Sequence, residues 1–126
     1  MNLPENLLYT DHDEWVRREG DTVVVGITEH AQDQLGELVH IEMPDVGDSF
    51  SAGEAICEVE SVKAVAEVYS PCDGEVIAVN EDLEDEAEKV NAGPYDAWLV
   101  KLRVEDPAAL EDLPTPAAYA AKVESV

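Results

Sequence analysis

Apolar and polar residues alternate along several stretches of the first hundred residues. The run at 22–27 is almost entirely β-branched and follows the turn Glu19-Gly20-Asp21. In 39–43, three apolar residues alternate with two polar ones and the run ends before Pro44. Alternation with period two is typical of strands with one buried face. We therefore predict strands at 22–27, 39–43 and 98–105. The apolar face of the second carries Val39, Ile41 and Met43, and that of the third carries Trp98, Val100, Leu102 and Val104.

Helix signals are short and mostly near the end of the chain. Thr28 can cap a helix over 29–35 that Gly36 closes. Asp106-Pro107 and Thr115-Pro116 each pair an N-cap residue with proline at the first helical position, which predicts one helix to about 113 and one to the C-terminus. The acidic stretch 81–88 is expected to be a loop or a single helical turn.

Together these elements predict a mainly β fold. We expect a small antiparallel β-barrel or sandwich with short peripheral and C-terminal helices. No stretch has the composition of a linker, so a single domain over residues 1–126 is expected.

The segment 57–68 fits a β-hairpin centred on Val62-Lys63. A one-residue slip would mix its two faces, so parity alone predicts that Lys63 lies at the tip. The turn lacks the glycine or Asn-Gly pair that two-residue hairpins prefer, which indicates that its side chains serve another purpose. In this register one face pairs Ser61 with Ala64, Val59 with Ala66 and Cys57 with Val68, and the other pairs Glu60 with Val65 and Glu58 with Glu67.

Two features flank this hairpin. The turn-strand segments 47–50 and 73–76 lie at similar distances on either side of Lys63, a weak sign of internal symmetry. In the hairpin register Cys57 and Cys72 are offset by about 13 Å along the strand, beyond the reach of a disulfide. Both cysteines are expected to be small buried hydrophobes.

The net negative charge of the chain excludes one class of function and favours one kind of source. Thirty Asp and Glu against seven Lys and Arg give a net charge of -23 and a pI near 4.1, which excludes direct nucleic-acid binding because phosphate contacts need cations. At molar salt the Debye length falls to about 3 Å and self-repulsion is screened. The composition therefore favours a halophilic source with a salt-rich cytoplasm. The alternative is an acidic protein that docks onto basic partners.

Other function classes find little support. The sequence contains no run of 18 apolar residues, the length that a membrane-spanning helix needs. Its first residues carry no secretory signal, so a cytoplasmic protein is expected. The histidines His12, His30 and His40 and the two cysteines have no metal-ligand spacing, so no metal site is expected.

Spacing alone leaves the role of Lys63 open. Two readings stay open: a solvated turn residue, and a lysine presented for covalent modification. A Schiff-base lysine needs burial or nearby cations, whereas the neighbours here are glutamates, so we expect no catalytic residue.

The residues around Lys63 also resemble a known family, the H proteins of the glycine cleavage system. The likeness covers nearly the whole chain, and its motifs are specific to the family when taken together. Around the tip it consists of Glu60-Ser61-Val62-Lys63-Ala64, Tyr69-Ser70-Pro71 and Gly74-Glu75-Val76. Elsewhere it includes Tyr9-Thr10, Trp15-Val16, Val25-Gly26-Ile27-Thr28, Ala31-Gln32, Leu35-Gly36, Glu42, Gly47-Asp48, Val90-Asn91, Pro94-Tyr95 and Trp98-Leu99.

The resemblance implies a monomeric carrier with a lipoyl-like flattened β-barrel. Lipoate would be joined to Lys63 as an amide, and Glu60, Ser61, Val62 and Ala64 would form the recognition surface for the lipoylating enzyme. A pyridoxal-phosphate glycine decarboxylase would load an aminomethyl group onto the arm, a folate-dependent aminomethyltransferase would remove it, and dihydrolipoamide dehydrogenase would reoxidise the dithiol.

H proteins are similar in folding the loaded arm into a cleft on their own surface, and by position Glu14 and His30 resemble the residues that hold it. Two departures stand out. The usual His-Glu-Trp is Asp13-Glu14-Trp15 in this chain, with His12 displaced by one, and the segment 94–98 is one residue shorter.

Several alternatives stay open at this point. A non-catalytic H-like protein would relay lipoate to other carriers, and an unmodified acidic binding module would carry no lipoate. A lipoyl domain of a 2-oxoacid dehydrogenase would normally show Asp-Lys-Ala within a longer chain, and a biotin carrier would show Met-Lys-Met. Val62 and Ala64 argue against the biotin carrier.

Overall fold

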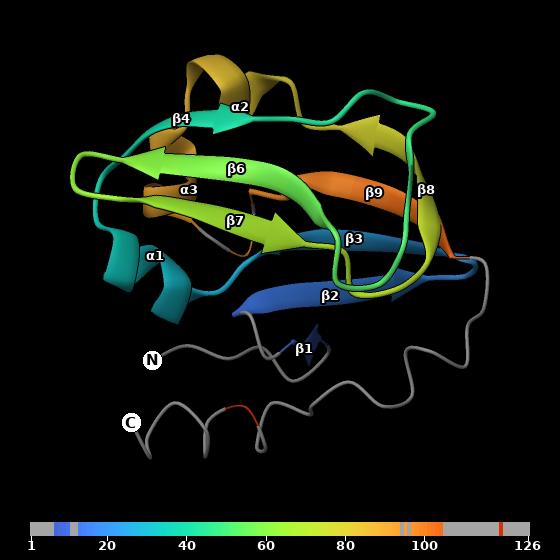
Figure 1. Ribbon diagram of the computed structural model, residues 1–126. Coiled ribbons are helices and arrows are strands. Elements are labelled where there is room, and N and C mark those ends of the chain that lie inside the picture. Colours follow the sequence, from blue (N-terminus) through green and yellow to red (C-terminus); the bar gives the residue numbers. More distant parts are fainter. Residues whose placement is uncertain (1–6, 11–12, 94, 96, 105–118, 120–126) are drawn as a thin grey trace.

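The computed structural model describes residues 7–10, 13–93, 95, 97–104 and 119 (Figure 1). The helices predicted after Asp106 and Thr115 lie outside the described residues. Within the described part, antiparallel strands form two sheets and helices are few, which confirms the mainly β fold.

The larger sheet has the strand order β1-β2-β3-β9-β8-β5. Its strands are β1 (Leu8–Tyr9), β2 (Glu14–Glu19), β3 (Thr22–Ile27), β5 (Ser49–Phe50), β8 (Gly74–Val79) and β9 (Val100–Val104). The smaller sheet has the order β4-β6-β7, with β4 (Leu38–Glu42), β6 (Ala55–Ser61) and β7 (Val65–Tyr69). The helices are α1 (Glu29–Leu35), α2 (Asp82–Asp85) and α3 (Glu88–Ala92).

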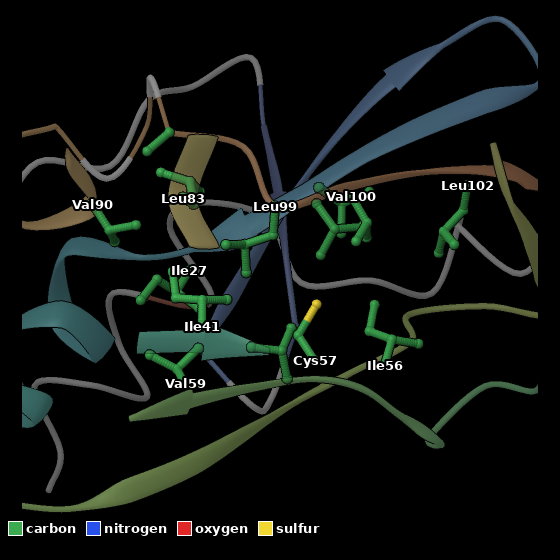
Figure 2. Close-up of a cluster of buried hydrophobic side chains, with 14 of the residues drawn as sticks. Ile27, Ile41, Ile56, Cys57, Val59, Leu83, Val90, Leu99, Val100 and Leu102 are labelled. Atoms are coloured by element: carbon green, nitrogen blue, oxygen red, sulfur yellow. The ribbon is translucent and has the colours of Figure 1, made fainter. Parts of the chain in front are cut away.

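The main core lies between the two sheets. Figure 2 shows Ile41, Cys57 and Val59 from the smaller sheet near Ile27, Leu99 and Val100. The other face of β3 is also covered, since Val24 packs with Tyr9, Trp15 and Tyr119. Burial on both faces explains why β3 reads as a continuous apolar run.

Helix α1 and its caps are confirmed. The Thr28 hydroxyl accepts a hydrogen bond from the Ala31 N–H at 3.2 Å, and Gly36 has φ 78°, in the region that favours glycine. The acidic stretch contains more helix than expected. The single turn α2 is followed by α3, and Leu83, Ala87 and Val90 anchor both in the core.

The strand at 38–42 corrects one prediction. Val39 is 53% exposed, whereas Leu38 and Ile41 are buried. The pairing register with β6 shifts between Leu38 and His40, and such a bulge re-aims the side chains that precede it. The sequence pattern could not locate that extra residue.

The strand predicted at 98–105 begins later than expected. Leu99 is fully buried in the main core, and Trp98 packs instead against the cluster around Tyr9 and Trp15. Alternation is regular only from Val100 onward, because the two residues before the strand lie against different clusters.

The two segments that echo each other around Lys63 are paired. Ser49 lies opposite Glu75 and Phe50 opposite Gly74 in antiparallel register. A Cβ at Gly74 would lie 2.7 Å from the carbonyl oxygen of Arg103, so this close approach requires glycine.

Candidate functional site

The hairpin that carries Lys63 is formed in the predicted register. Cys57 pairs with Val68, Glu58 with Glu67, Val59 with Ala66 and Glu60 with Val65. Cys57, Val59, Ser61 and Val68 are buried, while Glu58, Glu60, Val65 and Glu67 are exposed. The two-residue turn Val62-Lys63 is exposed, and in Figure 1 it lies at the same end of the molecule as α1.

Ser61 organises the turn from inside. Its Oγ accepts hydrogen bonds from the N–H groups of Lys63 (3.3 Å) and Ala64 (3.0 Å) and donates to the Ala64 carbonyl at 3.1 Å. The Ser61 N–H also donates to that carbonyl at 2.8 Å. These bonds satisfy the backbone of a tight turn without glycine or asparagine, and Val62 and Lys63 are both exposed.

A second segment supports the tip from outside. The Val62 N–H donates to the Glu37 carbonyl at 3.1 Å. The residues on either side of Glu37 are held by Asn91 of α3, whose Nδ2 donates to the Gly36 carbonyl at 2.7 Å and whose Oδ1 accepts from the Leu38 N–H at 2.9 Å. The turn is therefore fixed to α3 through residues 36–38.

Glutamates gather on the outer face of the smaller sheet. Glu42, Glu58 and Glu67 occupy directly opposed positions on β4, β6 and β7, and all three are exposed. Opposed like charges on neighbouring strands are destabilising. Among the described residues, the ion pairs involve other carboxylates: Glu19, Glu75 and Glu86.

A cleft of about 160 Å³ lies between α1 and the hairpin. Most of its lining is apolar, and the polar members are Asp13, Gln34 and Glu67. The apolar lining consists of Ile27, Ala31, Leu35, Val59, Ala66 and Val68. Such a lining suits an apolar chain that ends in a charged or polar group.

Glu14 is buried, with 1% of its surface exposed. One carboxylate oxygen accepts from the Thr10 hydroxyl at 2.9 Å and the other accepts from the Tyr69 N–H. Burial raises the pKa of Glu14 to about 7, although both hydrogen bonds oppose that rise. It lies next to Asp13 in the chain but is not among the residues that line the cleft.

His30 also lies outside the lining of the cleft. It is partly buried on α1, directly before Ala31. The holding role predicted for Glu14 and His30 stays a prediction. The sequence reasoning missed Asp13 and Gln34 as lining residues, and placed Glu67 only on the outer face of the hairpin. The i, i+3, i+4 spacing of Ala31, Gln34 and Leu35 was an available signal for one helix face.

Both cysteines are free and buried, which agrees with the prediction. Burial raises the pKa of the Cys57 thiol to about 12 and that of Cys72 to about 11, so neither supplies a thiolate at neutral pH. In the part of the chain that the structure describes, no group of three or more His, Cys, Asp or Glu could hold a metal ion. Its helices are also too short or too polar to cross a bilayer.

Comparisons with known proteins identify the family of this chain. The family model described as "Glycine cleavage H-protein" matches residues 7–126. The chain belongs to this family. As an H protein it is a carrier component of the glycine cleavage system, and a lipoyl-carrier role is consistent with its fold.

Individual relatives agree over almost the full length. The chain is 47% identical to a glycine cleavage system H protein of Halothermothrix orenii, with 100% of this chain and 99% of the relative covered. It is 55% identical to one of Alteromonas mediterranea, with 89% and 88% covered. A crystal structure of an H protein from Mycobacterium marinum superposes with a TM-score of 0.89 at 34% identity, covering 97% of this chain and 99% of that one.

Proposed function

We propose that this H protein carries lipoate as an amide on Lys63 and shuttles the aminomethyl group of glycine, within one carrier domain over residues 1–126. The observation that carries the proposal is the tip itself. An exposed lysine stands on a turn whose backbone is fixed by Ser61 and by Glu37. None of those bonds uses the lysine side chain, so Nζ is free to be acylated.

The recognition surface for the lipoylating enzyme would be the outward-facing part of the tip. Glu60, Val62 and Ala64 are exposed beside Lys63, and Val62 is 71% exposed. Ser61 is buried, and so its contribution is to shape the turn rather than to contact the enzyme.

The near end of the cleft beside α1, at Ala66, is within reach of such an arm. Ala66 and Val68 lie three and five residues beyond Lys63, or about 10 to 17 Å along an extended strand. A lysyl-lipoyl chain has about twelve bonds from Cα to its nearer sulfur, which spans roughly 14 Å when extended. Lipoate would supply a cyclic disulfide, which takes the one-carbon group on one sulfur and is left as a dithiol when the group departs, and the residues of the cleft would shelter the loaded end from water.

The partners implied are a pyridoxal-phosphate glycine decarboxylase, a folate-dependent aminomethyltransferase, dihydrolipoamide dehydrogenase and a lipoylating enzyme. A tethered arm raises the effective concentration of its cargo at each active site without tight docking. The carrier would act as a cytoplasmic monomer, and its net charge of -23 supports a halophilic source in which salt screens self-repulsion.

Intact mass after treatment with lipoate and a lipoylating enzyme tests the attachment. We expect a gain of one lipoyl group for wild type and for Lys89→Arg, whose exposed side chain pairs with Glu86, and no gain for Lys63→Arg. An unmodified wild type would overturn the proposal and favour an acidic binding module.

Exchange of bicarbonate into glycine with the decarboxylase then separates a glycine carrier from a lipoate relay. We expect exchange with the lipoylated protein and none with Lys63→Arg. Lipoylation without exchange would favour the relay.

A further inference from the structure

Large apolar side chains are exposed at four positions among the residues that the structure describes: Val39, Val46, Val62 and Val65. They are between 53% and 71% exposed. Val46 lies in the loop between β4 and β5, whereas Val62 directly precedes Lys63 and Val65 begins β7. A single exposed valine is ordinary, but a group of them marks an interaction surface. The position of Val39 therefore decides whether such a group exists.

The bulge in β4 places Val39 on the outer face of the smaller sheet. Leu38 pairs with Ser61 and His40 pairs with Glu60, so Val39 is the extra residue on β4. In such a bulge two residues of one strand oppose a single residue of its neighbour. Val39 and His40 therefore both lie opposite Glu60, and all three are exposed. The bulge thus exposes a residue that simple alternation predicts to be buried.

Val65 completes a row across the three strands. It lies opposite Glu60 on the other side of β6, the central strand (Figure 1). Val39 and Val65 are therefore about two strand spacings apart, or roughly 10 Å. With Val62 at the tip they form a group that we name the valine patch. The next outward-facing row contains only carboxylates: Glu42, Glu58 and Glu67. The outer face thus changes from partly apolar beside Lys63 to acidic further away.

The short reach of the unmodified lysine indicates which partner must contact this patch. Five bonds separate Cα from Nζ, a span of roughly 6 Å. In lipoylation the neutral amine attacks the acyl carbonyl of an activated lipoate, and the leaving group departs as the nitrogen loses a proton. The lipoylating enzyme must therefore bring its acyl donor to within that distance of the turn. Partners that act on the end of the finished arm have no such constraint.

An interface centred on the tip would include the valine patch. Val65 lies two residues beyond Lys63, about 7 Å along a strand, and Val39 lies on the same row. A standard protein interface covers about 800 Å² on each partner, which corresponds to a disc of roughly 16 Å radius. Such a disc reaches both valines.

The charges around the patch indicate the chemistry of the surface that fits it. Glu37, Glu58 and Glu60 are exposed nearby, and the whole chain carries a net charge of -23. Two copies of this chain that met through their patches would oppose these carboxylates, and that repulsion disfavours a homodimer. An apolar surface with cationic residues at its margin is complementary in both respects.

We propose that Val39 and Val65, together with Val62, form the docking surface for a lipoylating enzyme whose active-site entrance is apolar with a cationic margin. The inference rests on the proposed function and deepens it, because it adds Val39 and Val65 to the recognition surface at the tip. None of the three valines lines the cleft beside α1, so this docking is separate from the sheltering of the arm.

Initial rates of lipoate incorporation, measured by intact mass over a range of carrier concentrations, test the inference. We expect Val39→Thr and Val65→Thr each to raise KM about fourfold, the equivalent of one methyl group no longer buried, and the double variant to raise it about fifteenfold. The value of kcat should not change, because the turn that presents Lys63 is intact. Threonine keeps the β-branch, so the urea midpoint should also stay the same. Val46→Thr is the matched control, since Val46 is 62% exposed outside the patch.

Two further measurements identify the occupant of the patch. After complete lipoylation, the double variant should support bicarbonate exchange as wild type does, and a loss of exchange would overturn the assignment to the lipoylating enzyme. A wild type that sediments as a dimer, with a monomeric double variant, would assign the patch to a second copy of the chain instead. Wild-type KM in the double variant would overturn the docking role alone. A wild type that accepts no lipoate would overturn the proposed function as well, so the two failures are distinguishable.

Discussion

The backbone N–H of Val62 donates a 3.1 Å hydrogen bond to the carbonyl of Glu37. This bond joins the hairpin turn to the segment that leaves α1, two parts of the chain with no sequence proximity. It makes the position of Lys63 depend on residues 36–38, and these in turn depend on the carboxamide of Asn91. The tip that carries Lys63 is thus held by three separate parts of the chain: the hairpin, residues 36–38 and α3.

Asn91→Ala should loosen the tip. The substitution leaves the Gly36 carbonyl and the Leu38 N–H without their partner, at a cost of about 1–3 kcal/mol in the free energy of unfolding, and we expect slower lipoylation of the folded protein. Urea unfolding and a time course of intact mass measure the two effects. Asn80→Ala is a suitable control, since Asn80 donates to the Trp98 carbonyl away from the tip. It should destabilise without slowing lipoylation. Equal slowing by both variants would contradict a role for Asn91 in holding the tip.

Ser61→Ala should disturb the turn itself. It removes the oxygen that accepts from Lys63 and Ala64, and we expect a loss of about 1 kcal/mol in stability together with several-fold slower lipoylation. The measurements are denaturant unfolding and initial rates of lipoate incorporation. Ser49→Ala, an exposed change on β5, serves as the comparison. If Ser61→Ala accepts lipoate as fast as this control, the turn does not need the hydroxyl.

The raised pKa of Glu14 predicts how the stability of the protein depends on pH. Because its pKa in the folded protein is raised to about 7, above the value of 4.5 for an unperturbed glutamate, the folded state binds the proton more tightly. Stability from this group is therefore complete below about pH 4.5 and is lost as the pH rises toward 7. The shift corresponds to a loss of about 3 kcal/mol.

Glu14→Gln isolates this contribution from the other carboxylates. Urea unfolding at several pH values should show a smaller decline between pH 4.5 and 7 for the variant than for wild type. Glu84→Gln, exposed on α2, should follow the wild-type profile. Parallel profiles for wild type and Glu14→Gln would show that Glu14 titrates normally.

The opposed glutamates on β4, β6 and β7 predict a salt-dependent stability. Glu58 is the central member of the row, so Glu58→Gln should raise the free energy of unfolding by about 0.2–1 kcal/mol at low salt. The gain should disappear in 1 M KCl, where the Debye length is about 3 Å. Paired urea titrations at 0.01 and 1 M KCl give both values. A gain of the same size in both would assign the effect to packing rather than to charge.

Local pattern predicted the parts of this fold that depend on near neighbours. The register of β6 with β7 follows from parity, and the cap of α1 follows from Thr28 and Gly36. Val39 was misplaced because a one-residue bulge leaves no mark in the alternation of a five-residue strand. Trp98 was misplaced because which of two clusters it joins depends on tertiary packing.

The candidate site also contains local features that the sequence predicts and tertiary features that it does not. Lys63 and its neighbours lie within one hairpin and could be predicted from the sequence. The cleft combines residues from four elements and from the turn before β2. One lining residue, Asp13, accepts a hydrogen bond from Tyr119, which lies 106 positions further along the chain. No periodicity within a segment carries that information, and so Asp13 was recognised only as a departure from the family pattern.

The hydrogen bonds that shape the tip also bear on the surface that a partner protein would contact. They involve the backbone of residues 61–64, the Ser61 hydroxyl and Glu37, and not the ammonium of Lys63. On the proposed function, a lipoyl group on Lys63 would therefore change neither the turn nor its support. A partner protein would meet the same turn whether the arm is empty or loaded. The two forms would then differ in where the free end of the arm rests, inside the cleft or outside it.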